Sequence, residues 1–275
     1  MQDLRVKRLA RTAVRRVATA ADVVRSTDGI VILIYHRVGG RTPVSVDLPR
    51  SLFELQMAYL AEHCRPLTLD QAVEELRTGV AGRGGRGVVV TFDDGTADFV
   101  EEAVPVLAHH GVPATMYLAT AFLEDQRMFP DEGRPMTWAA AAEALASGVV
   151  TYGSHTHTHA LLDRIPPDAA AEELDRSVGL VQDRLGVDAQ HFAYPKALPA
   201  ASATEPLIRS RFRTAALGRT RPNRLGQTDL HRLTRSPVQL SDGMEWFERK
   251  VSGGMALESD LRDALNFWRY RRLTA

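Results

Sequence analysis

Apolar residues in this chain occur in two patterns, short continuous runs and longer segments in which they recur every three or four positions. The short runs indicate buried strands, and the longer spacing indicates amphipathic helices. Strands are predicted over 30–35, 88–92, 113–119, 149–153, 191–194 and 212–216. Helices are predicted over 51–63, 70–78, 98–110, 138–147, 168–185 and 257–269. This alternation predicts a parallel sheet or barrel with helices outside, whose active site lies at the carboxyl ends of the strands.

Several positions mark the ends of these elements. Ser51 and Glu54 have the spacing of a capping box at the start of the helix 51–63. Gly111 and Gly186 follow helical segments and are typical helix-ending glycines. The glycine-rich segment 79–87 is interpreted as a flexible connection, because a strand follows it and no helix N-terminus is available to hold a phosphate.

Both ends of the chain are basic. Residues 4–25 are predicted to form an amphipathic helix with an arginine-rich face. It is interpreted as packing on the domain, and a weak contact with an anionic membrane surface is the alternative. The basic and aromatic segment 268–272 has the same character and favours that alternative.

The composition is that of a globular protein, with 44% apolar and 25% charged residues among 275. The 34 basic and 34 acidic residues balance, which argues against a protein that coats nucleic acid. Cys64 is the single cysteine, so no internal disulfide can form. The sequence shows no export signal and no apolar run of about 20 residues. A cytoplasmic location is expected, with the inner face of the membrane as a peripheral site of contact.

Two adjacent aspartates, Asp93 and Asp94, follow the predicted strand 88–92 and precede Gly95. Two carboxylates packed together repel each other. A metal cation removes that conflict when one carboxylate binds it and the other is left as a base. A solvated Asp-Asp-Gly turn is the alternative interpretation.

A second group of polar residues follows the predicted strand 149–153. His155 and His159 have a His-x3-His spacing that can place both rings on one side of a helical turn. Imidazole is a common ligand of Zn²⁺. Two histidines and one carboxylate form the three-ligand, open set of a hydrolytic metal site, and the remaining aspartate is then the general base.

These motifs resemble those of the polysaccharide deacetylases of carbohydrate esterase family 4, which share the nodulation-type deacetylase homology domain. Thr91-Phe92-Asp93-Asp94-Gly95 corresponds to the first motif of the family, and residues 155–159 correspond to the second. Residues 33–38 and 192–195 resemble the exopolysaccharide-type subgroup. The resemblance implies a distorted, incomplete (β/α) barrel with seven or fewer parallel strands.

The resemblance also implies roles for individual residues. Asp93 corresponds to the general base, and Asp94, His155 and His159 correspond to the metal ligands. The metal implied is Zn²⁺, and Co²⁺ or Ni²⁺ fits the same ligands. The third-motif segment is expected to contact substrate through Tyr194, Pro195 and Lys196, with the Lys196 N–H stabilising the oxyanion.

The chain departs from the family pattern at two places. The third motif usually begins with an arginine that pairs with the base, and Ala193 stands there instead. Arg235 is the hypothesised replacement. The general-acid histidine of the fifth motif is not clearly present, and His36 and His231 are the candidates.

The resemblance implies a deacetylase that acts on an N-acetylated sugar in a glycan, glycolipid or glycosylated metabolite. Three alternatives stay open: an amidase or esterase of the same fold acting on a non-sugar substrate, a non-catalytic protein that binds metal or sugar, and a membrane-surface scaffold. The predicted division is a basic N-terminal helix over 1–28, a catalytic domain over 29–245 and a helical extension over 246–275.

Overall fold

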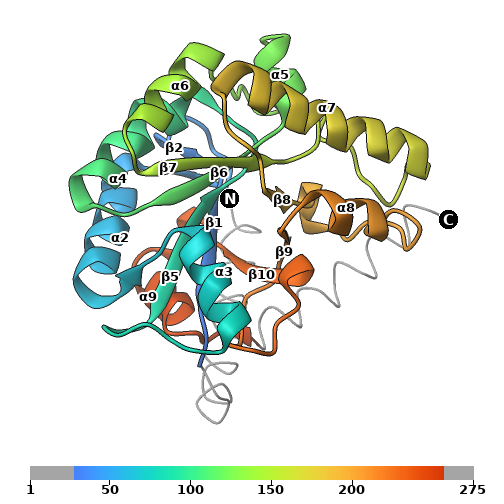
Figure 1. Cartoon of the computed structure of the whole chain (residues 1–275). Helices are drawn as coiled ribbons and strands as arrows, with labels where there is room; N and C mark the ends of the chain where they lie inside the picture. Colours follow the sequence, from blue (N-terminus) through green and yellow to red (C-terminus); the bar gives the residue numbers. More distant parts are fainter. Residues whose placement is uncertain (1–27, 257–275) are drawn as a thin grey trace, which may run out of the picture.

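The computed structural model describes residues 28–256, and a ring of parallel strands lies at its centre (Figure 1). The strands are hydrogen-bonded in the order β1-β10-β9-β8-β7-β6-β5-β4, and β1 also pairs with β5. They are β1 (Val31–Tyr35), β4 (Arg65–Pro66), β5 (Gly87–Phe92), β6 (Ala114–Leu118), β7 (Val150–Ser154), β8 (His191–Ala193), β9 (Thr214–Gly218) and β10 (Leu233–Pro237). Seven strands therefore close the ring and β4 lies outside it, which confirms the predicted barrel with fewer than the eight strands of a complete one.

Helices surround the ring (Figure 1). They are α2 (Arg50–His63), α3 (Leu69–Thr78), α4 (Val104–His110), α5 (Thr120–Glu124), α6 (Trp138–Ala146), α7 (Pro167–Leu185), α8 (Glu205–Arg211) and α9 (Glu245–Val251). Two short strands, β2 (Arg37–Val38) and β3 (Asp47–Leu48), pair with each other after β1. Within residues 28–256 every predicted element is present with its ends shifted by at most two residues, whereas α5, α8, α9 and β10 were not among the predicted elements.

Two details of the helices differ from the prediction. The helix α2 begins after Pro49 without any side-chain cap, so the capping box predicted at Ser51 and Glu54 is wrong. The helix predicted over 98–110 begins with a π-helical turn, η1 (Phe99–Ala103), before α4. Pro105 lies next to this turn, and its missing N–H cannot take part in a regular α-helical bond.

The core has two layers because side chains alternate between the faces of each strand. Leu33 and Tyr35 of β1 pack outward in a cluster that includes Phe53 of α2. Ile32 belongs to a second cluster with Tyr117 and other strand residues, which fills the ring. The ring interior is therefore mostly apolar, and a charged group inside it needs a partner.

Some predictions fall partly or wholly outside residues 28–256. The helices predicted over 4–25 and 257–269, and any contact of the basic termini with a membrane, lie outside the described residues. The cytoplasmic location and the boundaries at 28 and 245 stay predictions. Among the described residues no helix combines the length and apolar character needed to cross a bilayer.

Asp70, in the first turn of α3, joins this helix to the start of two strands. Its Oδ1 lies 3.3 Å from Nε2 of His191 and accepts a 2.5 Å hydrogen bond from Nη1 of Arg213. The His191 ring and then the Arg213 guanidinium hold the pKa of Asp70 below its usual range. A lowered pKa means that the ionised carboxylate stabilises the folded state.

We expect Asp70→Asn to lower the free energy of unfolding at pH 7, by less than about 1 kcal/mol because the side chain is more than half exposed. The contribution is present above the unfolded pKa of about 3.9 and is lost as the pH falls through the lower folded pKa. Urea unfolding of both proteins at pH 7 and pH 3 measures this. An equal difference at both pH values would contradict the expectation.

Candidate metal and active site

The two aspartates of the first motif lie where β5 leaves the ring. The Asp93 N–H donates to the Tyr35 carbonyl at 3.1 Å, which continues the pairing of β5 with β1. Asp94 has a left-handed backbone with φ 77°, and Gly95 follows with φ 106°. This turn at the strand end allows both carboxylates to reach one site, as the sequence predicted, although neighbouring strand residues normally point apart.

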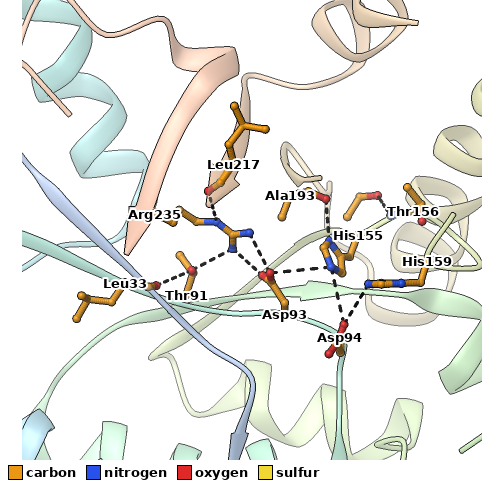
Figure 2. A network of polar contacts seen from close by, with 11 residues as sticks. Leu33, Thr91, Asp93, Asp94, His155, Thr156, His159, Ala193, Leu217 and Arg235 are labelled. Atoms are coloured by element: carbon orange, nitrogen blue, oxygen red, sulfur yellow. Dashed lines mark hydrogen bonds and ion pairs between the residues drawn. The ribbon is translucent and has the colours of Figure 1, made fainter. Parts of the chain in front are cut away.

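His155 and His159 come from the loop after β7. Their Nε2 atoms lie 3.8 Å and 3.6 Å from Oδ1 of Asp94 (Figure 2). The segment is not helical: Thr156 and His159 both have φ 63°. The helical turn suggested by the His-x3-His spacing is therefore wrong, and left-handed residues bring the two rings together instead.

The cluster of Asp94, His155 and His159 fits a metal ion, since one ligand atom from each lies within 4.8 Å of the others. Nδ1 of His155 lies 2.7 Å from the Ala193 carbonyl. A carbonyl only accepts, so Nδ1 carries the hydrogen, and Nε2 is the ring nitrogen left to bind a metal. A donor set of two imidazole nitrogens and one carboxylate oxygen suits Zn²⁺, Co²⁺ or Ni²⁺.

The electrostatics of the cluster favour a neutral imidazole at His159. Burial, and after it the neighbouring His155, lower the pKa of His159 to about 4, and the charge of Lys196 acts in the same direction. A histidine with this pKa is unprotonated at neutral pH and can bind a cation. His159 therefore does not need to lose a proton before it binds a metal.

Asp93 is held inside the ring by Arg235 of β10 (Figure 2). The two guanidinium Nη atoms donate to the two carboxylate oxygens at 2.6 Å and 2.9 Å. Arg235 is fully buried, and it also donates to Oγ1 of Thr91 and to the Leu217 carbonyl. Its guanidinium carbon lies 5.0 Å from the centre of the Tyr117 ring.

This pairing determines the charge of Asp93. Burial alone would raise the pKa of Asp93, but Arg235 and then His155 outweigh it and bring the pKa down to about 2. Oδ2 of Asp93 lies 3.9 Å from Nε2 of His155, beside the metal cluster. Asp93 is therefore an ionised acceptor next to the position where a metal would bind.

An open cavity of about 1490 Å³ lies over this cluster. His36, Asp93, Asp94, His155, His159 and Lys196 line it. Nδ1 of His36 is buried and has no hydrogen-bond partner in the part of the chain that the structure describes. Lys196 has an unfavourable left-handed backbone with φ 52°. Strained residues of this kind are concentrated at functional sites.

Three residues suggested by the sequence do not line this cavity. His231 lies in η3 (Leu230–Arg232), before β10, and its Nε2 is 2.8 Å from the Phe212 carbonyl. His231 is not part of the lining and its ring is held by this carbonyl, so we no longer consider His231 as the acid. Tyr194 is buried, and its hydroxyl donates to Glu205 of α8 at 3.1 Å. Pro195 is buried as well and is not part of the lining.

Two features of the site were not predicted from the sequence. The Ala193 carbonyl, which orients His155, is a backbone group that any residue supplies. Phe122 and Phe129 line the cavity with their rings stacked 4.0 Å apart. The apolar residues that follow the strand 113–119 were the available signal for this aromatic pair.

The fold and this cluster define a class, a parallel α/β barrel that carries a candidate metal site at the carboxyl ends of its strands. Residues 81–208 match the family model described as polysaccharide deacetylase. The chain carries a polysaccharide deacetylase domain over slightly less than half of its length, and the comparisons indicate a hydrolase. The family indicated by the sequence motifs is thus confirmed.

Individual relatives agree with this assignment. YxkH of Bacillus subtilis (strain 168), a protein named for the same family, is 24% identical over 164 residues, which are 60% of this chain and 55% of YxkH. The chain therefore spans little more than half the length of that curated relative. IcaB from Ammonifex degensii is 25% identical with a TM-score of 0.68, over 80% of this chain and 97% of that structure. The Streptococcus pyogenes deacetylase PplD, solved in complex with acetate, is 20% identical with a TM-score of 0.71. The match covers 82% of this chain and 99% of that structure, and it supports the fold.

Proposed function

We propose that this protein is a metal-dependent hydrolase that removes the acetyl group from an N-acetylated sugar. The observation that carries the proposal is the pair of adjacent carboxylates, Asp93 and Asp94, at the end of β5. Asp94 belongs to the cluster of possible metal ligands with His155 and His159, and Asp93 is an ionised carboxylate beside it. The polysaccharide deacetylase domain supports the reaction type.

Asp94, His155 and His159 would hold the metal, for which we propose Zn²⁺. A divalent metal in such a site lowers the pKa of water and polarises a carbonyl oxygen. Asp93 is held by two hydrogen bonds from Arg235, so its free lone pairs keep one direction toward the cavity. In this proposal Asp93 accepts the proton of the attacking water, and the backbone N–H of Lys196 stabilises the developing oxyanion.

The test is acetate release by the zinc-loaded protein from a panel of acetamido sugars. We expect one acetate for each free amine formed, and no release when Asp93→Asn is loaded with the same amount of zinc. Competition by non-substrate amides and esters would show whether sugar recognition is specific. A wild-type protein that binds zinc but releases no acetate from any member of the panel would contradict the proposal.

His36 is the residue we propose as the general acid, because its ring lines the cavity beside Asp93. An amine must gain a proton as it leaves, whereas an alkoxide needs this less. We therefore expect His36→Ala to lower kcat for an acetamide by about 10²-fold and to affect an O-acetyl ester less. The decline in the rate of acetamide hydrolysis at high pH should disappear in this variant.

The pH dependence of kcat/KM for His36→Ala measures this, with His231→Ala as the matched control. His231 is held by the Phe212 carbonyl and does not line the cavity, so its replacement should leave the profile unchanged. A wild-type decline at high pH that persists in His36→Ala would exclude His36 as the acid.

A further inference from the structure

The cavity over the cluster is larger than one sugar requires, and part of its lining is apolar. Its volume of about 1490 Å³ exceeds the roughly 300–1,000 Å³ of most small-molecule sites. Apolar side chains from a helix, a strand and several loops line it, and they include Val46, Phe122, Phe129, Pro130, Leu198 and Leu217. The Phe122 and Phe129 rings are nearly parallel, at 9°. Phe129 is buried and Arg127 lies over the Phe122 ring at 4.2 Å, so the other apolar residues supply most of the apolar lining open to a ligand.

The charged residues of the lining are mostly cationic. They are Arg37, Arg164, Lys196, Arg219 and Arg232. Four carboxylates share the lining, but Asp93 is paired with Arg235 and Asp94 belongs to the metal cluster. Arg232 and Arg164 lie near Glu205 and Asp163, and Arg219 has a partner as well. Lys196 has no acidic partner among the described residues, and a cation of this kind favours an anionic ligand.

Lys196 is the cation best placed to contact such an anion. It forms no ion pair with any residue of 28–256, whereas Arg232 lies 3.4 Å from Glu205 and Arg164 lies 4.0 Å from Asp163. Its left-handed backbone is held by hydrogen bonds that flank it, from the Ala197 N–H to Tyr194 and from the Leu198 N–H to Pro195. An unpaired cation on a strained turn beside the cluster is a site for a negative group.

Neutral polar side chains are few in the same lining. They are Thr96, Thr158, Thr234 and Gln239. A long neutral glycan would bring many hydroxyl groups into the cavity, and each is costly to bury without a partner. The lining therefore matches a charged, partly apolar ligand better than a neutral polymer.

We infer that the substrate is an acetamido sugar joined through a phosphate to an apolar group, with Lys196 contacting the phosphate and the apolar residues of the lining, such as Val46 and Leu198, contacting the apolar group. This inference rests on the proposed function. It goes beyond it by naming the substituent that selects the sugar.

The experiment is calorimetric titration of the zinc-loaded protein with analogues in which a methanesulfonamide replaces the acetamide. A sulfonamide resists hydrolysis, so binding is measured whether or not the protein is a deacetylase. Three ligands carry the same glucosamine-derived sugar: a neutral hexyl glycoside, a 1-phosphate monoester and a hexyl phosphodiester. A uridine diphosphate derivative tests a nucleotide as the alternative source of phosphate.

We expect the hexyl phosphodiester to bind about 10-fold or more tightly than the neutral glycoside, the effect of one charge-assisted contact. Lys196→Gln should reduce this ratio to about 2-fold. Arg83→Gln, which removes an exposed cation outside the lining, should leave it unchanged. Equal binding of the diester and the glycoside, or an unchanged ratio in Lys196→Gln, would overturn the role of the phosphate. A monoester or nucleotide derivative that binds as tightly as the hexyl diester would overturn the role of the apolar group.

Discussion

Replacing Asp94 with asparagine should lower kcat/KM for acetate release by about 10³-fold or more. The change removes the carboxylate of the proposed metal site, and a bound metal supplies several kcal/mol of transition-state stabilisation. Asparagine is preferred to alanine because Asp94 has φ 77°, a conformation that asparagine tolerates and that strains alanine. The fold should therefore survive, so that a loss of activity reports on the metal site.

The measurements are kcat/KM and the amount of zinc bound for each chain, on the same samples. Asp163→Asn is the matched control, because Asp163 lines the same cavity but is not part of the cluster. This control should bind zinc like the wild-type protein. If Asp94→Asn keeps both its zinc and its activity, Asp94 is not a functional ligand.

Much of the barrel could be predicted because its signals are local. Runs such as Val88-Val89-Val90 are buried strand residues, and Gly111 ends a helix with φ 63°, as its position in the sequence suggested. The residues at strand ends could also be assigned to one site, because the carboxyl ends of parallel strands meet at one end of a barrel. The positions of Asp93, Asp94, His155 and His159 follow from this topology.

The remaining features depend on contacts between distant segments. Arg235 and Asp93 are separated by 142 positions, and only the pairing of β10 with β1 brings them together.

The expectation that Tyr194 contacts substrate was wrong for a simpler reason. Ala193 packs with the residues that fill the ring, so the side chain that follows it points outward, where Tyr194 meets Glu205. Strict use of strand alternation would have excluded Tyr194 from the site.

The second large effect is expected for Arg235→Met, which should lower the free energy of unfolding by about 3–5 kcal/mol. Methionine fills part of the same space inside the ring but leaves Asp93 buried without its two hydrogen bonds. An unpaired carboxylate in this position carries the full cost of burial. The metal-free protein should be used, because a bound cation would partly replace the missing charge.

Urea unfolding of three variants separates the lost ion pair from a packing defect. Asp93→Asn combined with Arg235→Met removes both charges, and it should recover a large part of the stability lost in Arg235→Met alone. Arg209→Met is the control for losing an arginine, since the Arg209–Asp229 pair is about 40% exposed and should contribute less than about 1 kcal/mol. If Arg235→Met costs no more than Arg209→Met, the buried pair does not hold Asp93 in the folded protein, and the orientation of the proposed base must have another cause.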